Sequence, residues 1–257
     1  MLDSLNLSGR VAVVIGGTSG LGRAIALGLA EAGADVVPTG RREALVHEVC
    51  RQIEQSGRRS LAAAVDVLQR DTVETLRDRV LEEFGKVHIL VNSAGTMLRK
   101  PTVNITETEW HSMLDANLTG ALRTSQAFYE PLSASGHGRV INIASLNSFV
   151  SLNQVTAYAA AKGGLMALTR SLAVEWATRG VNVNAIAPGV FRTDLNRKLL
   201  DETERGRELL MRIPMKRFGC AEEVVGAAVL LASDAARYIT GQCIVVDGGF
   251  LASGVNT

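Results

Sequence analysis

A tyrosine and a lysine four residues apart are the first candidates for chemistry in this sequence. Tyr158 and Lys162 bound the segment Tyr158-Ala-Ala-Ala-Lys162, inside a long run of helix-forming residues. A spacing of four places both side chains on one face of a helix, where the ammonium can lie near the phenol. Such a pair could carry acid–base chemistry, although an ordinary pair on a helix surface has the same spacing.

Glycines and polar residues follow three segments that have the composition of buried strands. Asn92–Gly95 follows one such segment, Ser145 follows the next, and Pro188–Val190 follows a third. Each alone also fits a turn, a helix cap or a strand end. The carboxyl ends of parallel strands meet at one edge of a sheet, and open α/β sheets bind their ligands there. We therefore expect these residues to gather with Tyr158 at one site.

Alternating strands and helices must position those groups. Short aliphatic runs alternate with Ala- and Leu-rich stretches along the chain, which is typical of a parallel sheet with helices on both faces. No linker rich in Pro, Gly or Ser divides the chain. The pattern therefore predicts one α/β domain, residues 1–257, with about seven parallel strands. The expected strands are residues 11–15, 35–39, 60–66, 87–91, 138–144, 181–187 and 242–246.

The ends of several expected helices can be read as well. The first helix is expected over residues 23–32, and one long helix over residues 157–178. Asp71 and Thr106 are each followed three residues later by Glu, which is the capping-box pattern of a helix start. A charged, helix-prone stretch near 192–217 interrupts the alternation. We interpret it as a loop insertion that could close over the ligand edge of the sheet, although such charges more often form a simple solvated face.

Three glycines follow the first expected strand in the pattern Gly16-x-x-x-Gly20-x-Gly22. Glycines at this point allow a tight turn and a close approach of the backbone to a pyrophosphate. The N-terminus of the next helix adds free N–H groups and a positive dipole end. The spacing is not the commonest fingerprint, GxGxxG, and glycine turns often follow strands. The position after the first strand favours a dinucleotide site.

The end of the second expected strand indicates which dinucleotide would bind. A carboxylate there commonly accepts hydrogen bonds from the ribose hydroxyls of NAD, whereas an arginine accommodates the 2′-phosphate of NADP. This sequence has Thr39-Gly40-Arg41-Arg42 and no carboxylate. Arg41 and Arg42 could instead be solvated residues of a helix's first turn, but cations are disfavoured at that end of the helix dipole. We therefore expect NADP(H) in preference to NAD(H).

Composition excludes several other classes of protein. The chain has 257 residues, a net charge of +1, 47% hydrophobic residues and 21% charged residues, which is typical of a globular fold and not of a nucleic-acid-binding or disordered one. Three widely spaced cysteines and four histidines show no metal-ligand spacing, so no metal is expected, and the histidines are expected on the surface or on helix faces. No secretory signal or membrane span is recognisable. The expected location is the cytosol.

Taken together, the sequence resembles the short-chain dehydrogenase/reductase family over nearly its whole length. The family's glycine turn corresponds to Gly16, Gly20 and Gly22, its Asn-Asn-Ala-Gly element to Asn92–Gly95, and its C-terminal signature to Val246–Gly249. Ile15 replaces a common Thr, and Ser93 replaces the second Asn. The resemblance implies a doubly wound Rossmann fold and a homotetramer. It also implies that the cofactor contacts Gly16, Thr18, Ser19, Gly20, Leu21, Gly22, Arg41, Arg42, Asp66, Val67, Asn92, Ala94, Gly95, Tyr158, Lys162, Pro188, Gly189, Val190 and Thr193.

The resemblance also implies catalytic roles, for a hydride transfer between a nicotinamide and a carbonyl or secondary alcohol. Tyr158 would give a proton to the developing alkoxide, and Lys162 together with the oxidised nicotinamide would lower the pKa of Tyr158. Lys162 would also bind the ribose hydroxyls. Ser145 would donate a hydrogen bond to the substrate oxygen. Asn117 would hold a water that links Lys162 to solvent.

Substrate choice is expected in segments 96–102, 146–154 and 192–217. Stretches around Ser145, Pro188 and Ile213 resemble the gluconate 5-dehydrogenase and keto-deoxygluconate dehydrogenase branch, which suggests a sugar or sugar acid. Candidate substrate contacts are then Arg99, Asn147 and Arg192, although surface roles fit both arginines. A 3-oxoacyl-[acyl-carrier-protein] reductase shares every quoted motif and is the main alternative. A non-catalytic NADP(H)-binding regulator is a remote one.

Overall fold

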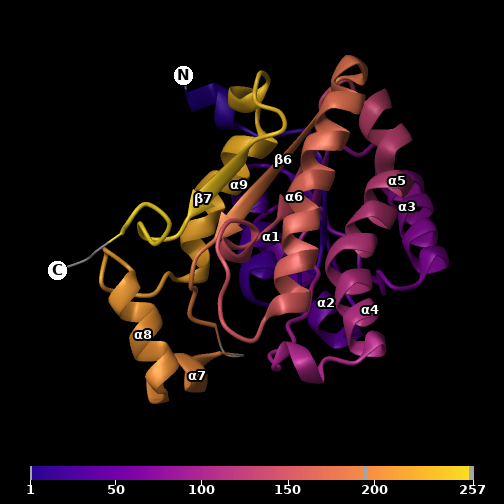
Figure 1. Ribbon diagram of the computed structural model, residues 1–257. Coiled ribbons are helices and arrows are strands. Elements are labelled where there is room, and N and C mark those ends of the chain that lie inside the picture. The colour runs from indigo at the N-terminus through magenta and orange to yellow at the C-terminus, as the bar shows by residue number, and fades with distance from the viewer. Residues whose placement is uncertain (1, 194–195, 255–257) are drawn as a thin grey trace.

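One parallel sheet organises the chain. The computed structural model describes residues 2–193 and 196–254, and in these residues seven strands pair in parallel in the order β3-β2-β1-β4-β5-β6-β7 (Figure 1). Helices connect the strands, so the single α/β domain with about seven parallel strands is confirmed. The strands are β1 (Val11–Ile15), β2 (Asp35–Gly40), β3 (Ala63–Ala64), β4 (Ile89–Asn92), β5 (Gly138–Ile143), β6 (Val181–Pro188) and β7 (Cys243–Val246).

Helices cover both faces of the sheet because its strands are apolar on both sides. Along β1, Ala12 and Val14 belong to the core under one set of helices, and Val13 and Ile15 belong to the core under the other. The first set is α1 (Gly20–Glu31), α2 (Glu43–Gln55) and α9 (Val225–Ala232); the second is α3 (Arg70–Phe84), α5 (Gly120–Ala134) and α6 (Thr156–Trp176).

The strand order reverses at β1, which pairs with β2 on one side and β4 on the other. The connections that follow β1 and β4 therefore leave toward opposite faces of the sheet. They open a crevice at the carboxyl edge, the usual ligand site of such sheets. In Figure 1 this edge lies at the lower end of the molecule, opposite the N-terminal residues.

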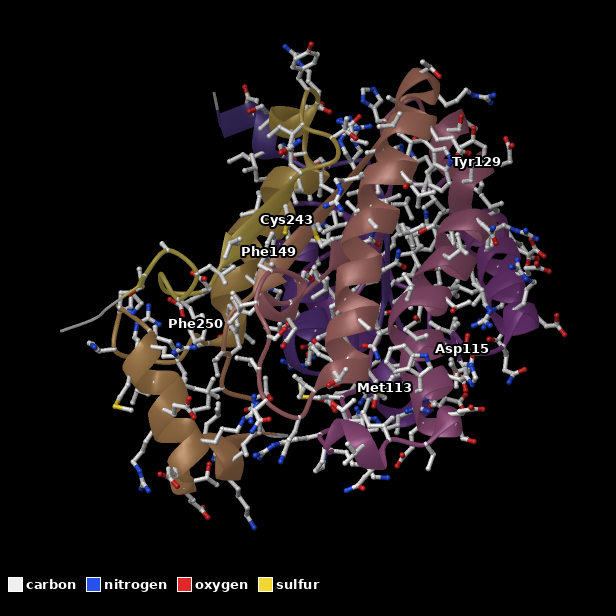
Figure 2. All side chains as sticks on the ribbon, in the orientation of Figure 1. Met113, Asp115, Tyr129, Phe149, Cys243 and Phe250 are labelled. Carbon is white, nitrogen blue, oxygen red and sulfur yellow. The ribbon has the colours of Figure 1, made fainter. Side chains whose placement is uncertain are left out.

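Three further helices lie at that carboxyl edge: α4 (Glu107–Leu114), α7 (Arg197–Glu202) and α8 (Glu204–Arg212). The last two occupy the expected insertion. They pack on a small core of their own, in which Leu200 and Leu209 meet Leu146 and Phe250. Figure 2 shows Phe250 next to α8, and the Arg212 guanidinium lies 5.9 Å from the centre of its ring. The insertion is thus fixed to the loop that follows β5.

Some expected boundaries are wrong. α1 begins at Gly20 rather than Arg23, and β3 has two residues rather than seven. The capping box at Thr106 is confirmed, but the one at Asp71 is wrong. There the Thr72 hydroxyl donates to the carbonyls of Asp66 and Gln69, and the helix begins at Arg70 without a side-chain cap. Among the described residues no helix is long and apolar enough to cross a membrane.

His88 also departs from expectation, because it is buried rather than on the surface. It directly precedes β4, only 7% of it is exposed, and its Nδ1 accepts a hydrogen bond of 3.0 Å from the backbone N–H of Val11. The imidazole thus satisfies a buried donor at the start of β1, which a helix-face position would not require. Burial lowers the pKa of His88 to about 4.

Candidate active site

Lys162 projects from α6 to the carboxyl end of β5. Only 5% of the residue is exposed, and its Nζ donates a 2.7 Å hydrogen bond to the carbonyl of Ile143, the last residue of β5. The Nζ lies 5.7 Å from the centre of the Tyr158 ring, one helical turn earlier. Burial lowers the pKa of Lys162 to about 8. The expected convergence of ammonium and phenol is therefore present.

The Tyr158 phenol lies against Ser145. Burial raises the pKa of Tyr158, and a hydrogen bond with the Ser145 side chain lowers it by less. Lys162 is not among the groups that shift the pKa of Tyr158 in the chain alone, so its expected effect together with the oxidised nicotinamide stays a prediction for the cofactor-bound enzyme. Lys162 Nζ points at the Ile143 carbonyl and its charge is itself disfavoured by burial, so the desolvation of the phenol dominates.

Asn147 positions the Ser145 hydroxyl from the opposite side. The Ser145 Oγ accepts hydrogen bonds from the backbone N–H of Asn147 at 3.2 Å and from its Nδ2 at 3.4 Å. The Oδ1 of Asn147 accepts from the backbone N–H of Leu152 at 3.3 Å. Asn147 is buried, so this substrate candidate lies beside the expected catalytic serine and is locked to the following loop.

Asn117 lies in a single turn of π-helix, Asp115–Thr119, between α4 and α5. Its Nδ2 donates to the carbonyls of Met113 and Thr96, at 3.0 and 2.9 Å. A Cβ at Gly95 would lie 2.5 Å from the Asn117 Oδ1 and 3.8 Å from Lys162 Nζ, so the loop after β4 passes close to both groups. Figure 2 shows Met113, just before this turn, beside the lower end of α6.

Asn92 has a different position from its neighbours in the loop. The Thr124 hydroxyl donates to its Oδ1 at 2.6 Å, and its Nδ2 donates to the Oδ1 of Asn142 at 2.9 Å. The Nδ2 of Asn142 donates in turn to Thr169 at 2.9 Å. This buried chain of side chains joins β4 and β5 to α5 and α6. What Asn92 can offer a cofactor is therefore its backbone.

The glycine turn after β1 fits a dinucleotide. A Cβ at Gly16 would lie 2.7 Å from the backbone nitrogen of Ala94, and one at Gly22 would lie 2.1 Å from the carbonyl oxygen of Gly16. Only glycine allows these approaches, and Gly16 also has a positive φ of 79°. The N-terminus of α1, from Gly20 to Gly22, consequently opens toward the crevice between β1 and β4.

Two contacts extend this turn toward the end of β2. The Arg42 guanidinium donates a 3.2 Å hydrogen bond to the Ser19 hydroxyl, and the Thr18 side chain contacts Gly40, whose Cβ would lie 2.7 Å from its Oγ1. Arg41 is exposed. Arg42 thus reaches over the first turn of α1, where a phosphate on the adenosine ribose of NADP would need a cation.

The remaining cofactor candidates lie on either side of the crevice. The Asp66 carboxylate accepts from the backbone N–H of Leu68, and Arg123 donates to the carbonyl of Val67, which fixes the loop after β3. On the other side, Gly189 N–H donates to the carbonyl of Val246, and Thr193 lies 3.8 Å from where a Cβ of Gly20 would be. Gly95 lies beside Asn117, and Pro188 is the last residue of β6. Leu21 packs against the core under α1 and α9, and Val190 against the core of α7 and α8. The cofactor contacts expected of these four residues stay predictions.

The two candidate arginines differ. Arg192 forms an ion pair with Asp201 of α7 and so is committed to holding the insertion. Arg99 is exposed, and within residues 2–193 and 196–254 no carboxylate pairs with it. A third arginine, Arg205 on α8, donates to the carbonyl of Asn153 at 3.2 Å and lies near Arg99. The sequence did not single out Arg205, because a charged helix does not show which of its side chains contacts a distant loop.

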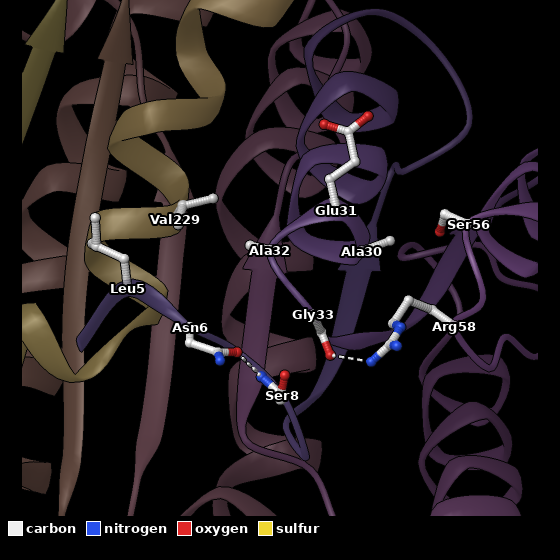
Figure 3. Close-up of a pocket in the computed structure, with 10 residues that line it drawn as sticks. All are labelled: Leu5, Asn6, Ser8, Ala30, Glu31, Ala32, Gly33, Ser56, Arg58 and Val229. Atoms are coloured by element: carbon white, nitrogen blue, oxygen red, sulfur yellow. Dashed lines mark hydrogen bonds between the residues drawn. The ribbon is translucent and has the colours of Figure 1, made fainter. Parts of the chain in front are cut away.

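A well-defined cleft lies away from these residues. This open cleft has a volume of about 570 Å³ and lies at the amino edge of the sheet, between the N-terminal residues, the end of α1 and α9. Figure 3 shows the residues that line it. Its one drawn cation, Arg58, donates to the carbonyl of Gly33. None of the expected site residues lines this cleft.

Comparison with known proteins agrees with this geometry. A family model described as enoyl-(acyl carrier protein) reductase matches residues 16–251. The chain is 41% identical to the 2-dehydro-3-deoxy-D-gluconate 5-dehydrogenase of Escherichia coli, over 98% of this chain and 99% of that protein. It is 36% identical to the 3-oxoacyl-[acyl-carrier-protein] reductase of E. coli, over 95% and 98%.

A solved structure gives the same result in three dimensions. The gluconate 5-dehydrogenase of Burkholderia cenocepacia, in complex with NADP and tartrate, superimposes with a TM-score of 0.93 at 36% identity, covering 98% of this chain and 99% of that one. These matches span the glycine turn, the crevice and the Tyr158–Lys162 helix. The chain therefore belongs to the short-chain dehydrogenase/reductase family, whose members are NAD(P)-dependent oxidoreductases acting on CH–OH groups.

Proposed function

We propose that this enzyme interconverts the secondary alcohol and the ketone of a sugar acid, with NADP(H) as the hydride carrier. The observation that carries the proposal is the convergence of Asn117, Ser145, Tyr158 and Lys162 at the carboxyl edge, next to the dinucleotide turn. The sugar acid is supported by relatives named as dehydrogenases of gluconate and 2-dehydro-3-deoxy-D-gluconate. It is also supported by Arg99, which forms no ion pair with a carboxylate of the described residues.

The chain's own side chains manage the proton and the developing charge. The nicotinamide, when bound, accepts or supplies the hydride at the carbon that bears the reacting oxygen. During oxidation Tyr158 takes the hydroxyl proton, and during reduction it returns it. Ser145, oriented by Asn147, donates a hydrogen bond to the same oxygen. Lys162 places a buried positive charge beside the phenol, and Asn117 holds the loop of Thr96 against Lys162.

A preference for NADP(H) is part of the proposal. Arg42 reaches the Ser19 hydroxyl over the start of α1, and the end of β2 carries no carboxylate that would repel a phosphate. Solved relatives contain NADP. We also propose, from family membership, a cytosolic homotetramer.

The test is an absorbance assay of NADPH with three substrate classes. Purified protein would be offered aldonates and ketoaldonates, an acetoacetyl thioester, and simple ketones or secondary alcohols, each with the phosphorylated and the unphosphorylated dinucleotide. We expect kcat/KM for a sugar acid to exceed that for the thioester by at least about tenfold. We also expect NADP(H) to be favoured over NAD(H), with the preference reduced in Arg42→Ala.

Each other outcome identifies a different function. Turnover of the thioester but not of any sugar acid would make the chain a 3-oxoacyl reductase, the second relative named above. Tight NADPH binding with no turnover in any class would favour a non-catalytic regulator. Faster reaction with NAD(H) in the wild type would contradict the role given to Arg42.

A further inference from the structure

We propose that Arg205 of α8, together with Arg99, binds the carboxylate of the substrate and so makes the enzyme selective for acids over neutral polyols. This inference rests on the proposed function, because it names the group that recognises the acid. Neither the sequence motifs nor the comparisons assign a role to Arg205. It differs from Arg192, whose guanidinium is already paired with Asp201.

One short loop brings the two arginines together. The guanidinium of Arg205 donates from Nη1 to the carbonyl of Asn153 at 3.2 Å. The next carbonyl along the chain, that of Gln154, accepts a 2.8 Å hydrogen bond from the backbone N–H of Lys100, the residue after Arg99. Adjacent carbonyls of the loop before α6 therefore hold α8 on one side and the segment of Arg99 on the other.

The two positive charges at this point are only partly balanced. Burial lowers the pKa of Arg205, Arg99 lowers it further, and Glu208 opposes the shift. In the described part of the chain neither Arg99 nor Arg205 forms an ion pair with a carboxylate. Two other arginines near the edge are paired, Arg123 with Asp115 and Arg217 with Glu223. Two neighbouring guanidiniums with free donors fit a bound carboxylate, which would also relieve their repulsion.

The position along the chain also fits a short acid. The loop that Arg205 and Lys100 contact leads directly into α6, and Tyr158 lies in the first turn of that helix. A 2.6 Å hydrogen bond between Thr102 and Thr156 holds the segment after Arg99 to the start of the same helix. Hydrogen bonds therefore tie the segments of both guanidiniums to the start of the helix that carries the phenol. A short polyhydroxy acid could place its carboxylate at the two guanidiniums and its secondary alcohol at the phenol of Tyr158.

The experiment compares Arg205→Gln, Arg99→Gln and the control Arg207→Gln. Arg207 is exposed on the same helix, two positions from Arg205 and therefore on a different face. Binding of gluconate to the enzyme with NADP⁺ present would be measured by calorimetry, and kcat/KM would be measured for sugar acids and for a neutral polyol of the same length. Arg205→Gln should weaken gluconate binding and raise the KM for acids about tenfold, with kcat/KM for the polyol unchanged.

The double variant Arg99→Gln/Arg205→Gln should lose less affinity than the product of the single losses, because both side chains bind one carboxylate. Unchanged gluconate binding in Arg205→Gln, an equal loss in Arg207→Gln, or an equal loss toward the neutral polyol would overturn the role of Arg205. Wild-type protein that does not bind gluconate would overturn it too. If gluconate binds in an Arg205-dependent way but no sugar acid is turned over, only the proposed function is refuted. If sugar acids are turned over and Arg205→Gln does not change their kcat/KM, only the carboxylate site is refuted.

Discussion

The two ends of strand β5 both carry buried titratable groups, but they use them differently. At the carboxyl end, Lys162 donates to Ile143 and lies beside a phenol and the crevice between β1 and β4. At the amino end, Arg139 is 4% exposed and lies in a cluster around Asp234. Both ends contain cations that burial disfavours. Burial of a charge therefore does not by itself mark an active site in this fold.

The groups at the amino end stabilise one another instead of facing a ligand. The Arg10 guanidinium donates to Asp234 at 3.2 Å, His137 lies 3.6 Å from the same carboxylate, and neutral His88 accepts from the N–H of Val11. The nearby cleft of Figure 3 is lined by other residues. At the carboxyl end, by contrast, the glycine turn and the loop after β4 approach each other and Lys162 closely, as a dinucleotide site requires. The topology of the sheet, more than the burial of its residues, therefore indicates which edge carries the active site and which edge has only structural charges.

The sharpest test of this difference is Lys162→Met. Removing the ammonium should lower kcat/KM by about a thousandfold, because the Tyr158 phenol loses the adjacent positive charge that favours its ionised form. The free energy of unfolding at pH 7.5 should stay the same or rise, because Met fills similar space without a buried charge. Activity would be measured with the best substrate from the panel, and stability by chemical denaturation.

The pH dependence gives an independent readout of the same group. The pKa of Lys162 falls from its ordinary value near 10.5 to about 8 on folding, so the unfolded chain binds more protons between these values. Stability from this group therefore rises as pH increases from 8 to 10.5, by about 2 kcal/mol. The difference in the free energy of unfolding between wild type and Lys162→Met should show this rise with pH. A variant that lost stability at pH 7.5 as well as activity would make Lys162 a structural residue.

His88→Asn tests the opposite end. Burial lowers the pKa of His88 from 6.5 to about 4, so the unfolded chain binds more protons between these values. Wild-type stability should therefore fall by about 2 kcal/mol as pH drops from 6.5 to 4.5, through this residue. Asparagine keeps an acceptor for the N–H of Val11 but does not titrate, so the variant should lose that slope. Denaturation curves at several pH values would measure it.

Activity provides the control for His88→Asn. The turnover of folded protein at pH 7.5 should match that of wild type within about twofold, because His88 precedes β4 at the end of the sheet away from Tyr158. Hydrogen-bonded ion pairs lower the pKa of Glu109 and of Glu223 to about 2. Measurements above pH 4.5 therefore exclude most of the pH dependence of stability that these two carboxylates cause. An unchanged slope in the variant, or a large loss of turnover, would contradict the structural role of this histidine.

Much of this arrangement follows from local patterns in the sequence. Aliphatic runs predict the strands because strands that are buried on both faces must be apolar throughout. The glycines after β1 predict the cofactor turn because only glycine allows backbone contacts such as that between Gly16 and Ala94. The spacing of Tyr158 and Lys162 predicts a shared helix face. Each of these patterns lies within a few residues of the structural element that it predicts.

The features that sequence reasoning missed depend on contacts between distant segments. The π-turn that holds Asn117 depends on the carbonyls of Met113 and Thr96, and the second is about twenty residues away. His88 is buried against Val11 on a neighbouring strand, and Arg205 contacts Asn153, about fifty residues away. The sequence favours Arg192 as a substrate contact just as well, and only its ion pair with Asp201 in the folded chain argues against that role. Tertiary packing decides such cases.

Thr106→Ala has the smallest expected effect. It tests whether a residue near the carboxyl edge can have a purely structural role. The Thr106 hydroxyl accepts from the N–H of Glu109, and the Glu109 carboxylate accepts from the N–H of Thr106, which fixes the start of α4. The variant should lose about 1 kcal/mol of stability, the usual cost of an N-cap, with turnover unchanged. Asp71→Ala is the matched control at a box that does not form, and its loss should be smaller, within about 0.5 kcal/mol. Equal losses in the two variants would mean that the cap contributes nothing specific, and a loss of turnover in Thr106→Ala would tie the start of α4 to the positioning of Asn117.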